Sequence, residues 1–318
     1  MKKIPILLIV LMLAGCSLLS LQSGVVAVPW HALLTDWQPG REHYYVLMEY
    51  RLPRLLLALF VGAALAVAGV LVQGIIRNPL ASPDILGVNH AASLASVGAL
   101  LLLPSLPVVV LPLLAFAGGM AGLILLKLLA KTSQPMKLAL TGVALSACWA
   151  SLTDYVMLSR PQEVNSALLW LTGSLWGRDW HFVNIAVPLL ILLLPLSLCF
   201  SRDLDLLALG EARAATLGVS VKRSQFWGLL LAVAMTATGV AVCGPISFIG
   251  LVVPHMVRKI TGGRHRRLLP VSALTGALLL AIADLLARMI HPPLELPAGV
   301  LTAIIGAPWF VWLLVRMR

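Results

Sequence analysis

Ten strongly apolar stretches follow one another along the chain, and they constrain its fold more than any other feature. They cover residues 4–28, 52–75, 85–103, 108–129, 138–158, 184–200, 225–243, 246–260, 270–290 and 298–315. A helix needs about 20 apolar residues to cross the hydrocarbon core of a bilayer, and most of these stretches approach that length. Backbone in lipid must satisfy its own hydrogen bonds, so the stretches predict helices. Because 60% of the residues are hydrophobic and only 11% are charged, a soluble globular fold is excluded.

We therefore expect an all-α polytopic membrane protein with about ten transmembrane helices in a single domain, residues 1–318. Several helices should be kinked or short. The stretch 246–260 is brief for a span, and Pro or Gly interrupts others. The interrupting residues are Pro112, Pro188, Pro195 and Gly239.

The N-terminus resembles a lipoprotein signal, with a basic start, an apolar run and LAGC ending at Cys16. A cleaved signal normally precedes a mostly polar mature protein. Here the apolar run continues towards Val28, and many more apolar stretches follow. We expect an uncleaved first membrane helix, although the sequence leaves processing at LAGC open.

The basic residues are distributed unevenly between the loops on the two sides of the membrane. If the N-terminus lies inside, ten spans place all but six of the 23 Lys and Arg residues on the inner side. The exceptions are Arg41, Arg51, Arg54, Arg160, Arg178 and Arg288. Cytoplasmic loops carry an excess of positive charge, so this distribution predicts cytoplasmic N- and C-termini. It also explains the net charge of +11 without a nucleic-acid partner.

Three of the outer arginines lie at the ends of predicted membrane helices. Arg51 and Arg54 are three residues apart at the start of the second stretch, and Arg288 lies at the outer end of the ninth. They could form a ring that binds carboxylates of a protein outside the membrane, because Arg suits bidentate carboxylate pairing. Alternatively, they reach lipid headgroups or pair locally, Arg288 with Asp284 and Arg51 with Glu49.

The segment Ser201–Arg223 can neither cross a membrane nor form a core alone. From Leu206 to Leu217 it shows helical spacing, and Gly218 is a natural stop. Asp203 or Asp205 could cap the helix start. At 1.5 Å per residue such a helix is about 18 Å long. A short amphipathic helix on the basic side suggests a contact for a soluble partner, with an ordinary interfacial connector as the alternative.

No motif for bond chemistry is present in the sequence. It lacks a phosphate-binding GxxxxGK[ST] loop, HExxH, CxxC and GxSxG, and its His and Cys residues show no ligand spacing. We expect no catalytic residues, no metal site and no cofactor. Asp154 and Asp284 are the acids closest to predicted spans, so a proton-coupled secondary transporter remains the rival class.

Several long motifs resemble the ABC-importer permeases for iron chelates and cobalamin. They are YRLPR (Tyr50–Arg54), AGVLVQGIIRNPLASPDILGV (Ala68–Val88), LDLLALGEARAATLGV (Leu204–Val219), GPISFIGLVVPHMVR (Gly244–Arg258), ADLLAR (Ala283–Arg288) and ELPAGVLTAIIGAPWF (Glu295–Phe310). They cover nearly the whole chain in one order. The resemblance implies a bacterial inner-membrane permease that imports an iron chelate by alternating access. Within the family the chain is most similar to ferric citrate permeases; another siderophore, haem or cobalamin is the alternative cargo.

The resemblance also implies partners and residue roles. The partners are a second, paralogous permease subunit in a heterodimer, two cytoplasmic ATPase subunits that hydrolyse ATP, a periplasmic substrate-binding protein and membrane lipid. The segment 201–223 matches the helix that couples the permease to its ATPase. The implied ATPase contacts are Leu207, Gly210, Glu211, Ala214 and Leu217. Arg51, Arg54 and Arg288 match positions that dock the binding protein, and Asn78 and Leu80 match a cytoplasmic gate. A Pro-rich break that ends a helix, with Asn78 capping freed backbone groups, is the alternative for the gate.

Overall fold

The protein is described from a computed structural model that places residues 4–103, 105–107, 110–131, 134–292 and 294–316. In these ranges it is helical, with connecting loops and no strand. Each of the ten predicted stretches contains a helix. These helices are α1 (Ile4–Gln22), α3 (Leu52–Ile76), α4 (Val88–Leu102), α5 (Leu111–Ala130), α6 (Pro135–Ser159), α8 (Trp180–Leu196), α11 (Val221–Cys243), α12 (Ile249–Thr261), α13 (His265–Met289) and α14 (Ala298–Arg316).

Shorter elements connect these helices. They are α2 (Ala32–Thr35), the π-helical turn η1 (Tyr45–Arg51), the 3₁₀ turns η2 (Pro83–Leu86) and η4 (Ser197–Phe200), α7 (Val164–Leu171), α9 (Ser201–Leu207) and α10 (Glu211–Thr216). The turn η1 runs directly into α3, so this helical segment begins before the predicted residue 52. Pro112 lies in the first turn of α5, where its missing N–H interrupts no helical bond.

Seven helical segments in the described ranges are long and apolar enough to cross a membrane. Two of them join neighbouring elements, Tyr45–Ile76 through η1 and Trp180–Leu207 through η4. Helices α4 and α14 supply shorter apolar segments. Helix α12 has 13 residues, about 20 Å at 1.5 Å per residue, which agrees with the short eighth stretch.

Helix α3 forms the centre of the molecule and packs against α8, α11, α12 and α13. Glycine pairs allow two of these neighbours to approach its backbone closely. A Cβ on Gly62 would lie 2.4 Å from the carbonyl oxygen of Gly276 in α13, and a Cβ on Gly69 would lie 1.9 Å from that of Gly250 in α12. Small residues of this kind allow tight helix packing where lipid offers no hydrophobic driving force.

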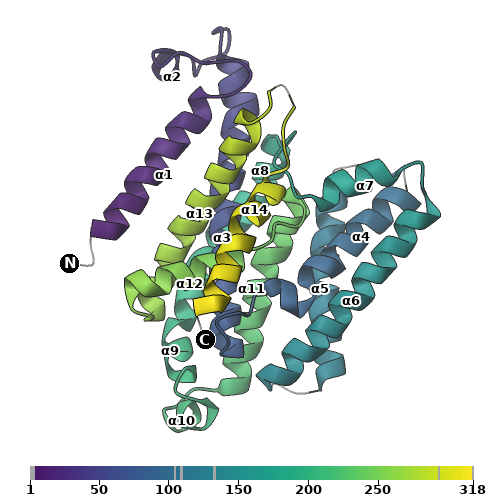
Figure 1. Cartoon of the computed structure of the whole chain (residues 1–318), viewed down its shortest axis with the longest axis vertical. Coiled ribbons are helices and arrows are strands. Elements are labelled where there is room, and N and C mark those ends of the chain that lie inside the picture. The colour runs from purple at the N-terminus through teal and green to yellow at the C-terminus, as the bar shows by residue number, and fades with distance from the viewer. Residues whose placement is uncertain (1–3, 104, 108–109, 132–133, 293, 317–318) are drawn as a thin grey trace.

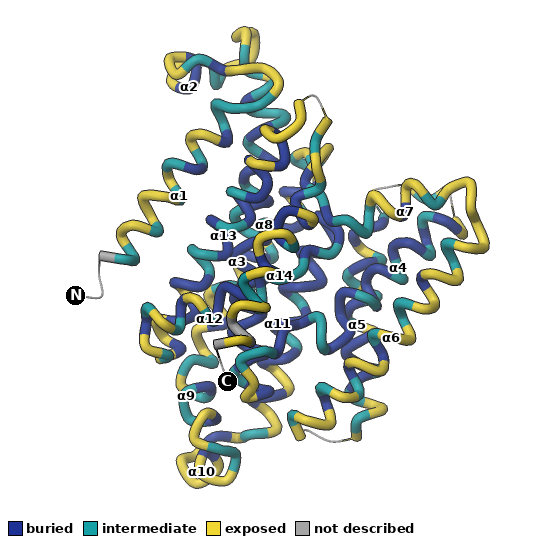
Figure 2. The backbone as a smooth tube through the Cα atoms, in the orientation of Figure 1, coloured by how far each residue is buried: buried dark blue, intermediate teal, exposed yellow. Residues whose placement is uncertain are grey.

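A second group of helices, α4 to α7, lies to one side of this centre, as Figure 1 shows. Helix α4 packs against both α5 and α6, and α11 connects the group to the centre. Much of α1 and α6 is exposed (Figure 2). Their exposed large apolar side chains include Leu11, Leu140 and Leu158. This exposure is expected of helices that face lipid or another membrane subunit.

The molecule has two ends that carry polar loops (Figure 1). The end with α2 is called the α2 end, and the opposite end with α9 and α10 is called the α10 end. The N-terminal end of α1 and the C-terminal end of α14 both point towards the α10 end (Figure 1). The predicted arginine ring and the predicted coupling segment therefore lie at opposite ends of the molecule.

Candidate functional site

Arg54, in the first turn of α3, lies at the centre of a buried ionic network near the α2 end. Its guanidinium contacts Asp284 of α13 at 2.8 Å and Glu295, before α14, at 2.5 Å. The hydroxyl of Tyr50 also donates to Glu295, at 3.3 Å. The side chain of Arg54 is only 2% exposed. A single cation at the start of α3 therefore binds the end of α13 and the loop before α14, which lie 230 and 241 positions further along the chain.

Arg288 and Arg51 belong to the same buried region. Arg288 lies 3.4 Å from Asp284 and donates to the backbone oxygen of Ser20 at 3.2 Å and to its hydroxyl at 2.5 Å. Arg51 donates to the backbone oxygens of residues 21, 22 and 26, just after α1 or in its last turn. Both arginines are 3% exposed. They attach the end of α1 to α3 and α13.

In the isolated chain these three arginines do not form an open ring of cations, and docking of a binding protein through them stays a prediction. Arg51, Arg54 and Arg288 are brought together, but their charges face inward and are already bound. The local pairing of Arg288 with Asp284 is confirmed. Arg51 binds backbone oxygens rather than Glu49, because α1 ends beside it. Glu295 and Ser20 were not predicted, since only tertiary contacts bring residues so distant in sequence to these arginines.

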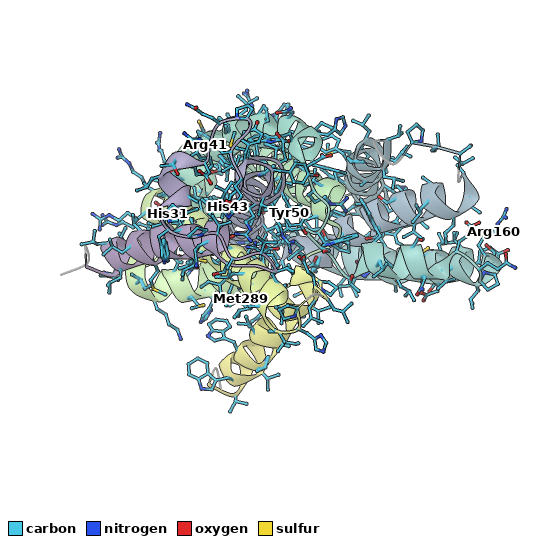
Figure 3. The ribbon with its side chains drawn as sticks, turned by 90° about the horizontal axis from the view of Figure 1, so that it is seen from above. His31, Arg41, His43, Tyr50, Arg160 and Met289 are labelled. Carbon is cyan, nitrogen blue, oxygen red and sulfur yellow. The ribbon has the colours of Figure 1, made fainter. Side chains whose placement is uncertain are left out.

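The arginines that are exposed at the α2 end are not the three of the buried network. Arg41 follows α2, and Arg160 follows α6, and both are exposed. Seen from above in Figure 3, they lie on opposite sides of the molecule, with Tyr50 between them.

Asp36, five residues before Arg41, pairs with His43, whose Nδ1 lies 2.9 Å from its carboxylate. The hydrogen bond from His43 lowers the pKa of Asp36 below its ordinary value of 3.8, because it favours the charged form.

At the α10 end, the single helix predicted from Leu206 to Leu217 is broken into α9 and α10. Gly210 separates them with φ of +103°, a conformation that glycine adopts readily and other residues rarely do. The predicted stop at Gly218 is confirmed, with φ of +88° just beyond Leu217, the residue that follows α10. Asp203 and Asp205 do not cap the helix start: Asp203 accepts from Ser224, and Asp205 from the backbone N–H of His265 at 3.0 Å.

The predicted ATPase contacts divide into inner and outer residues. Leu207 and Ala214 are buried against Val219 and hold α9 and α10 together. Leu217 is 50% exposed, and so is Leu209, at 51%, which was not among the predicted contacts. While the two helices stay packed, Leu207 and Ala214 are not available to a partner. The exposed positions between residues 209 and 217 are Leu209, Ala212, Arg213, Ala215, Thr216 and Leu217, and this set is called the α10 surface.

Polar contacts attach this region to the membrane helices. Glu211, at the start of α10, pairs with Arg77 at the end of α3 at 3.1 Å and accepts from Gln225 of α11 at 3.2 Å. In addition, Asp205 of α9 lies 2.6 Å from Nδ1 of His265 at the start of α13. Each short helix is thus connected to the core by a carboxylate, and the Arg77–Glu211 pair is 37% exposed on both sides.

The predicted gate residues follow directly after Arg77. The side chain of Asn78 accepts a hydrogen bond from the backbone N–H of Leu80 at 2.9 Å, which stabilises the turn after α3. Asn78 is exposed and Leu80 is half-buried. The helix break of the alternative is present, but the side chain of Asn78 bonds to Leu80 beyond the helix rather than to the freed carbonyl groups of α3. The gate role stays a prediction, and the Arg77–Glu211 pair links this turn to α10.

The two acids considered for proton coupling do not form a relay. Asp284 is paired with two arginines, whereas Asp154 is exposed on α6. Asp154 borders a cavity of about 450 Å³ that is also lined by Asp84, Asn89 and His90. No group of three or more His, Cys, Asp or Glu residues within the described ranges could hold a metal ion.

Comparisons with known proteins place these features in a family. The chain is 85% identical over 318 residues to the Fe(3+) dicitrate transport system permease protein FecD of Escherichia coli (strain K12), covering 100% of both chains. It is 45% identical to the Fe(3+)-citrate import system permease protein YfmE of Bacillus subtilis (strain 168), covering 98% of this chain and 94% of that protein.

A solved structure, described as an inward-facing conformation of a metal-chelate type ABC transporter, matches with a TM-score of 0.89 at 31% identity. The match covers 99% of this chain and 100% of the solved one. The model of the FecCD transport family matches residues 7–316. With a family match over almost its whole length, this helical membrane chain belongs to the FecCD transport family.

Proposed function

We propose that the chain is the permease subunit of an ATP-driven importer that carries ferric citrate from the periplasm to the cytoplasm by alternating access. The observation that carries this proposal is 85% identity over the full length to a permease named for Fe(3+) dicitrate. The 45% identity to a second citrate-import permease, from another organism, supports the same cargo. Another siderophore, haem or cobalamin remains the alternative cargo.

In this proposal the chain forms one permease domain and catalyses no reaction. It pairs with a paralogous permease, and two cytoplasmic ATPase subunits hydrolyse ATP. Nucleotide must favour one permease conformation strongly, because reversing a 1:99 population takes roughly 5.5 kcal/mol. A periplasmic protein delivers the chelate.

The inner membrane is the proposed location, with the α10 end and both termini in the cytoplasm. The N-terminal end of α1 and the C-terminal end of α14 point in the same direction, towards the α10 end, which supports placing both termini on one side of the membrane.

The α10 surface is the proposed ATPase contact. It combines exposed apolar side chains, Leu209 and Leu217, with the exposed cation Arg213. Of the contacts expected from the family, Leu217 lies on this surface, Gly210 and Glu211 border it, and Leu207 and Ala214 support it from within. Glu211 of α10 pairs with Arg77 at the end of α3. A displacement of α10 by the ATPase would therefore be transmitted to the turn of Asn78 and Leu80, the proposed gate.

Docking of the binding protein through Arg51, Arg54 and Arg288 requires an exchange of partners. All three are buried, and Arg54 is already paired. Glu295 is the more exposed of the two acids on Arg54, at 12% against 1% for Asp284. We therefore assign the exchange to Glu295: a carboxylate of the docking protein takes its place on Arg54.

The exchange makes opposite predictions for the two partners. Glu295→Gln removes the negative charge that competes with the docking protein for Arg54. It should therefore tighten docking in a binding assay with the purified binding protein. Arg54→Glu should weaken docking, while ATPase association remains intact in both variants. If Glu295→Gln weakens docking as much as Arg54→Glu does, the exchange assignment is wrong.

Uptake of radioactive iron citrate into proteoliposomes tests the function itself. With the partner permease, ATPase and binding protein present, we expect uptake that depends on ATP and on citrate as the chelator. Uptake without the ATPase, abolished by Asp154→Asn, would instead identify a proton-coupled transporter. Preference for hydroxamate siderophores, haem or cobalamin over ferric citrate would change the cargo but retain the mechanism.

A further inference from the structure

A long cavity of about 800 Å³ lies between α5, α8 and α11, away from the arginine network. Most of its walls are apolar. Helix α5 contributes Phe116 and Met120, α8 contributes Leu189 and Leu193, and α11 contributes Leu230 and Ala234. Spans α5 and Trp180–Leu207 bury only 28% of their apolar windows inside the chain, so both present much of their surface to the surroundings. The cavity is thus an apolar groove along the side of the molecule.

One end of the groove is polar. There it is lined by Ser220, just before α11, and by Arg223 and Trp227 on the first turns of that helix. Arg223 and Trp227 are both exposed. Trp with a neighbouring cation is typical of the membrane–water interface, where an apolar ring and a charged group lie at the depth of the lipid headgroups. The groove therefore has an apolar length and a cationic mouth.

The charges at this mouth favour an anion. No carboxylate pairs with Arg223 among the residues that the structure describes, and Lys222 beside it is likewise without one. Asp203 is the acid that lines the groove, and its carboxylate accepts a hydrogen bond from Ser224. Arg202, next to Asp203 in the sequence, is exposed but does not line the groove. At the mouth, Arg223 is therefore a cation without a carboxylate partner in the described part of the chain, while Asp203 is engaged by Ser224.

We propose that this groove binds an anionic phospholipid, with an acyl chain along the α5–α8–α11 walls and the phosphate at Arg223 and Ser220. Basic pockets between membrane helices on the cytoplasmic side bind anionic headgroups in this way. A groove with apolar walls and a cation at one end suits a ligand with an apolar chain and an anionic headgroup. It suits an apolar helix of another subunit less well. The inference depends on neither the cargo nor the docking partner.

Lipid titration of the delipidated full-length chain, followed by native mass spectrometry, tests the proposal. The probes are dioleoylphosphatidylglycerol, which is anionic, and dioleoylphosphatidylcholine, which is zwitterionic. We expect tighter binding of phosphatidylglycerol. Arg223→Gln should weaken that binding about fivefold, since one basic side chain near a membrane surface contributes about 1 kcal/mol.

Two further variants separate the groove from the general surface. Arg202→Gln removes an exposed cation that does not line the groove, so binding should change less than twofold. Ala234→Phe fills part of the apolar groove without altering its charge, so it should weaken the binding of both lipids. The assembled importer should retain phosphatidylglycerol on purification.

Four results would overturn the proposal. They are equal affinity for the two lipids, an Arg202→Gln effect as large as that of Arg223→Gln, wild-type binding by both Arg223→Gln and Ala234→Phe, and an assembled importer without bound phosphatidylglycerol. The last result would show that another subunit covers the groove.

Discussion

The two ends of the molecule use their charged residues in opposite ways. At the α2 end, the cations of α3 and α13 are buried, and Arg54 and Asp284 are at most 2% exposed. At the α10 end, the Arg77–Glu211 pair is 37% exposed on both sides, and Arg213 is exposed. Burial strengthens an ion pair and makes an unpaired charge very unfavourable, whereas water screens an exposed pair. The buried network at the α2 end is therefore sensitive to the loss of any one partner, while the α10 end is held mainly by apolar packing.

This difference suits the proposed roles of the two ends. A network that joins the end of α1, α3, α13 and the loop before α14 lets one docking event act on several helices at once. Two short helices whose ion pairs to the core each include a side chain at least 37% exposed can move as a unit with little electrostatic penalty. Four predictions test the contrast, beginning with the largest expected effect.

Replacing Asp284 should cause the largest loss of stability. Asp284→Asn leaves Arg288 without its carboxylate and Arg54 with Glu295 alone. Removing one partner of a buried pair typically costs about 3–5 kcal/mol. Thermal unfolding in detergent measures the change, and Asp154→Asn, at an exposed acid, is the matched control with an expected effect below about 0.5 kcal/mol. Equal melting temperatures for the two variants would contradict a buried network.

At the α10 end, apolar packing should matter more than charge. Leu207 is 1% exposed, so Leu207→Ala should lower stability by about 2 kcal/mol, at the lower limit for a buried leucine. Leu209→Ala, at 51% exposure, should leave the melting temperature nearly unchanged but weaken copurification with the ATPase. The division into inner and outer residues would be rejected if Leu209→Ala lowered the melting temperature while Leu207→Ala weakened only copurification with the ATPase.

Breaking the exposed ion pair at this end should have a smaller, local effect. Glu211→Gln weakens the contact with Arg77, which contributes below about 1 kcal/mol because both side chains are partly solvated. Hydrogen exchange of residues 208–218 should accelerate, while global unfolding changes little. Arg213→Gln, whose side chain faces solvent, should leave exchange unaltered yet loosen ATPase association. Unchanged exchange in Glu211→Gln would mean that the pair does not restrain α10.

The smallest expected effect concerns the loop around α2 and its response to pH. Because the pKa of Asp36 is lowered in the folded chain, its contribution to stability is present above pH 3.8 and is lost as the pH falls below that value. Exchange of residues 31–44, corrected for intrinsic rates, should therefore rise at pH 3 relative to pH 6. Asp36→Asn should abolish this dependence, and a persistent dependence would assign it to another group.

Much of the architecture was predictable because it depends on local composition. Each of the ten apolar stretches forms a helix, and the short eighth one became α12. The stop at Gly218 also followed from the sequence, since glycine accepts a positive φ at low cost. The break at Gly210 was missed, although the same residue type carries it, because helical spacing on both sides suggested a continuous helix.

Residue pairs across the fold could not be predicted in the same way. Arg54 and Glu295 are 241 positions apart, and nothing in their local sequence indicates that they meet. The pairing of Arg288 with Asp284 was accessible, because one helical turn separates them.

The sequence by itself determined that this chain spans a membrane many times and that cations gather at particular helix ends, because apolar length and charge position are local properties. Only the tertiary structure decided that Arg51, Arg54 and Arg288 face inward and that Leu207 and Ala214 support the α10 surface from within. Burial is set by which helices pack together, and close backbone approach at Gly62–Gly276 and Gly69–Gly250 brings those helices into contact.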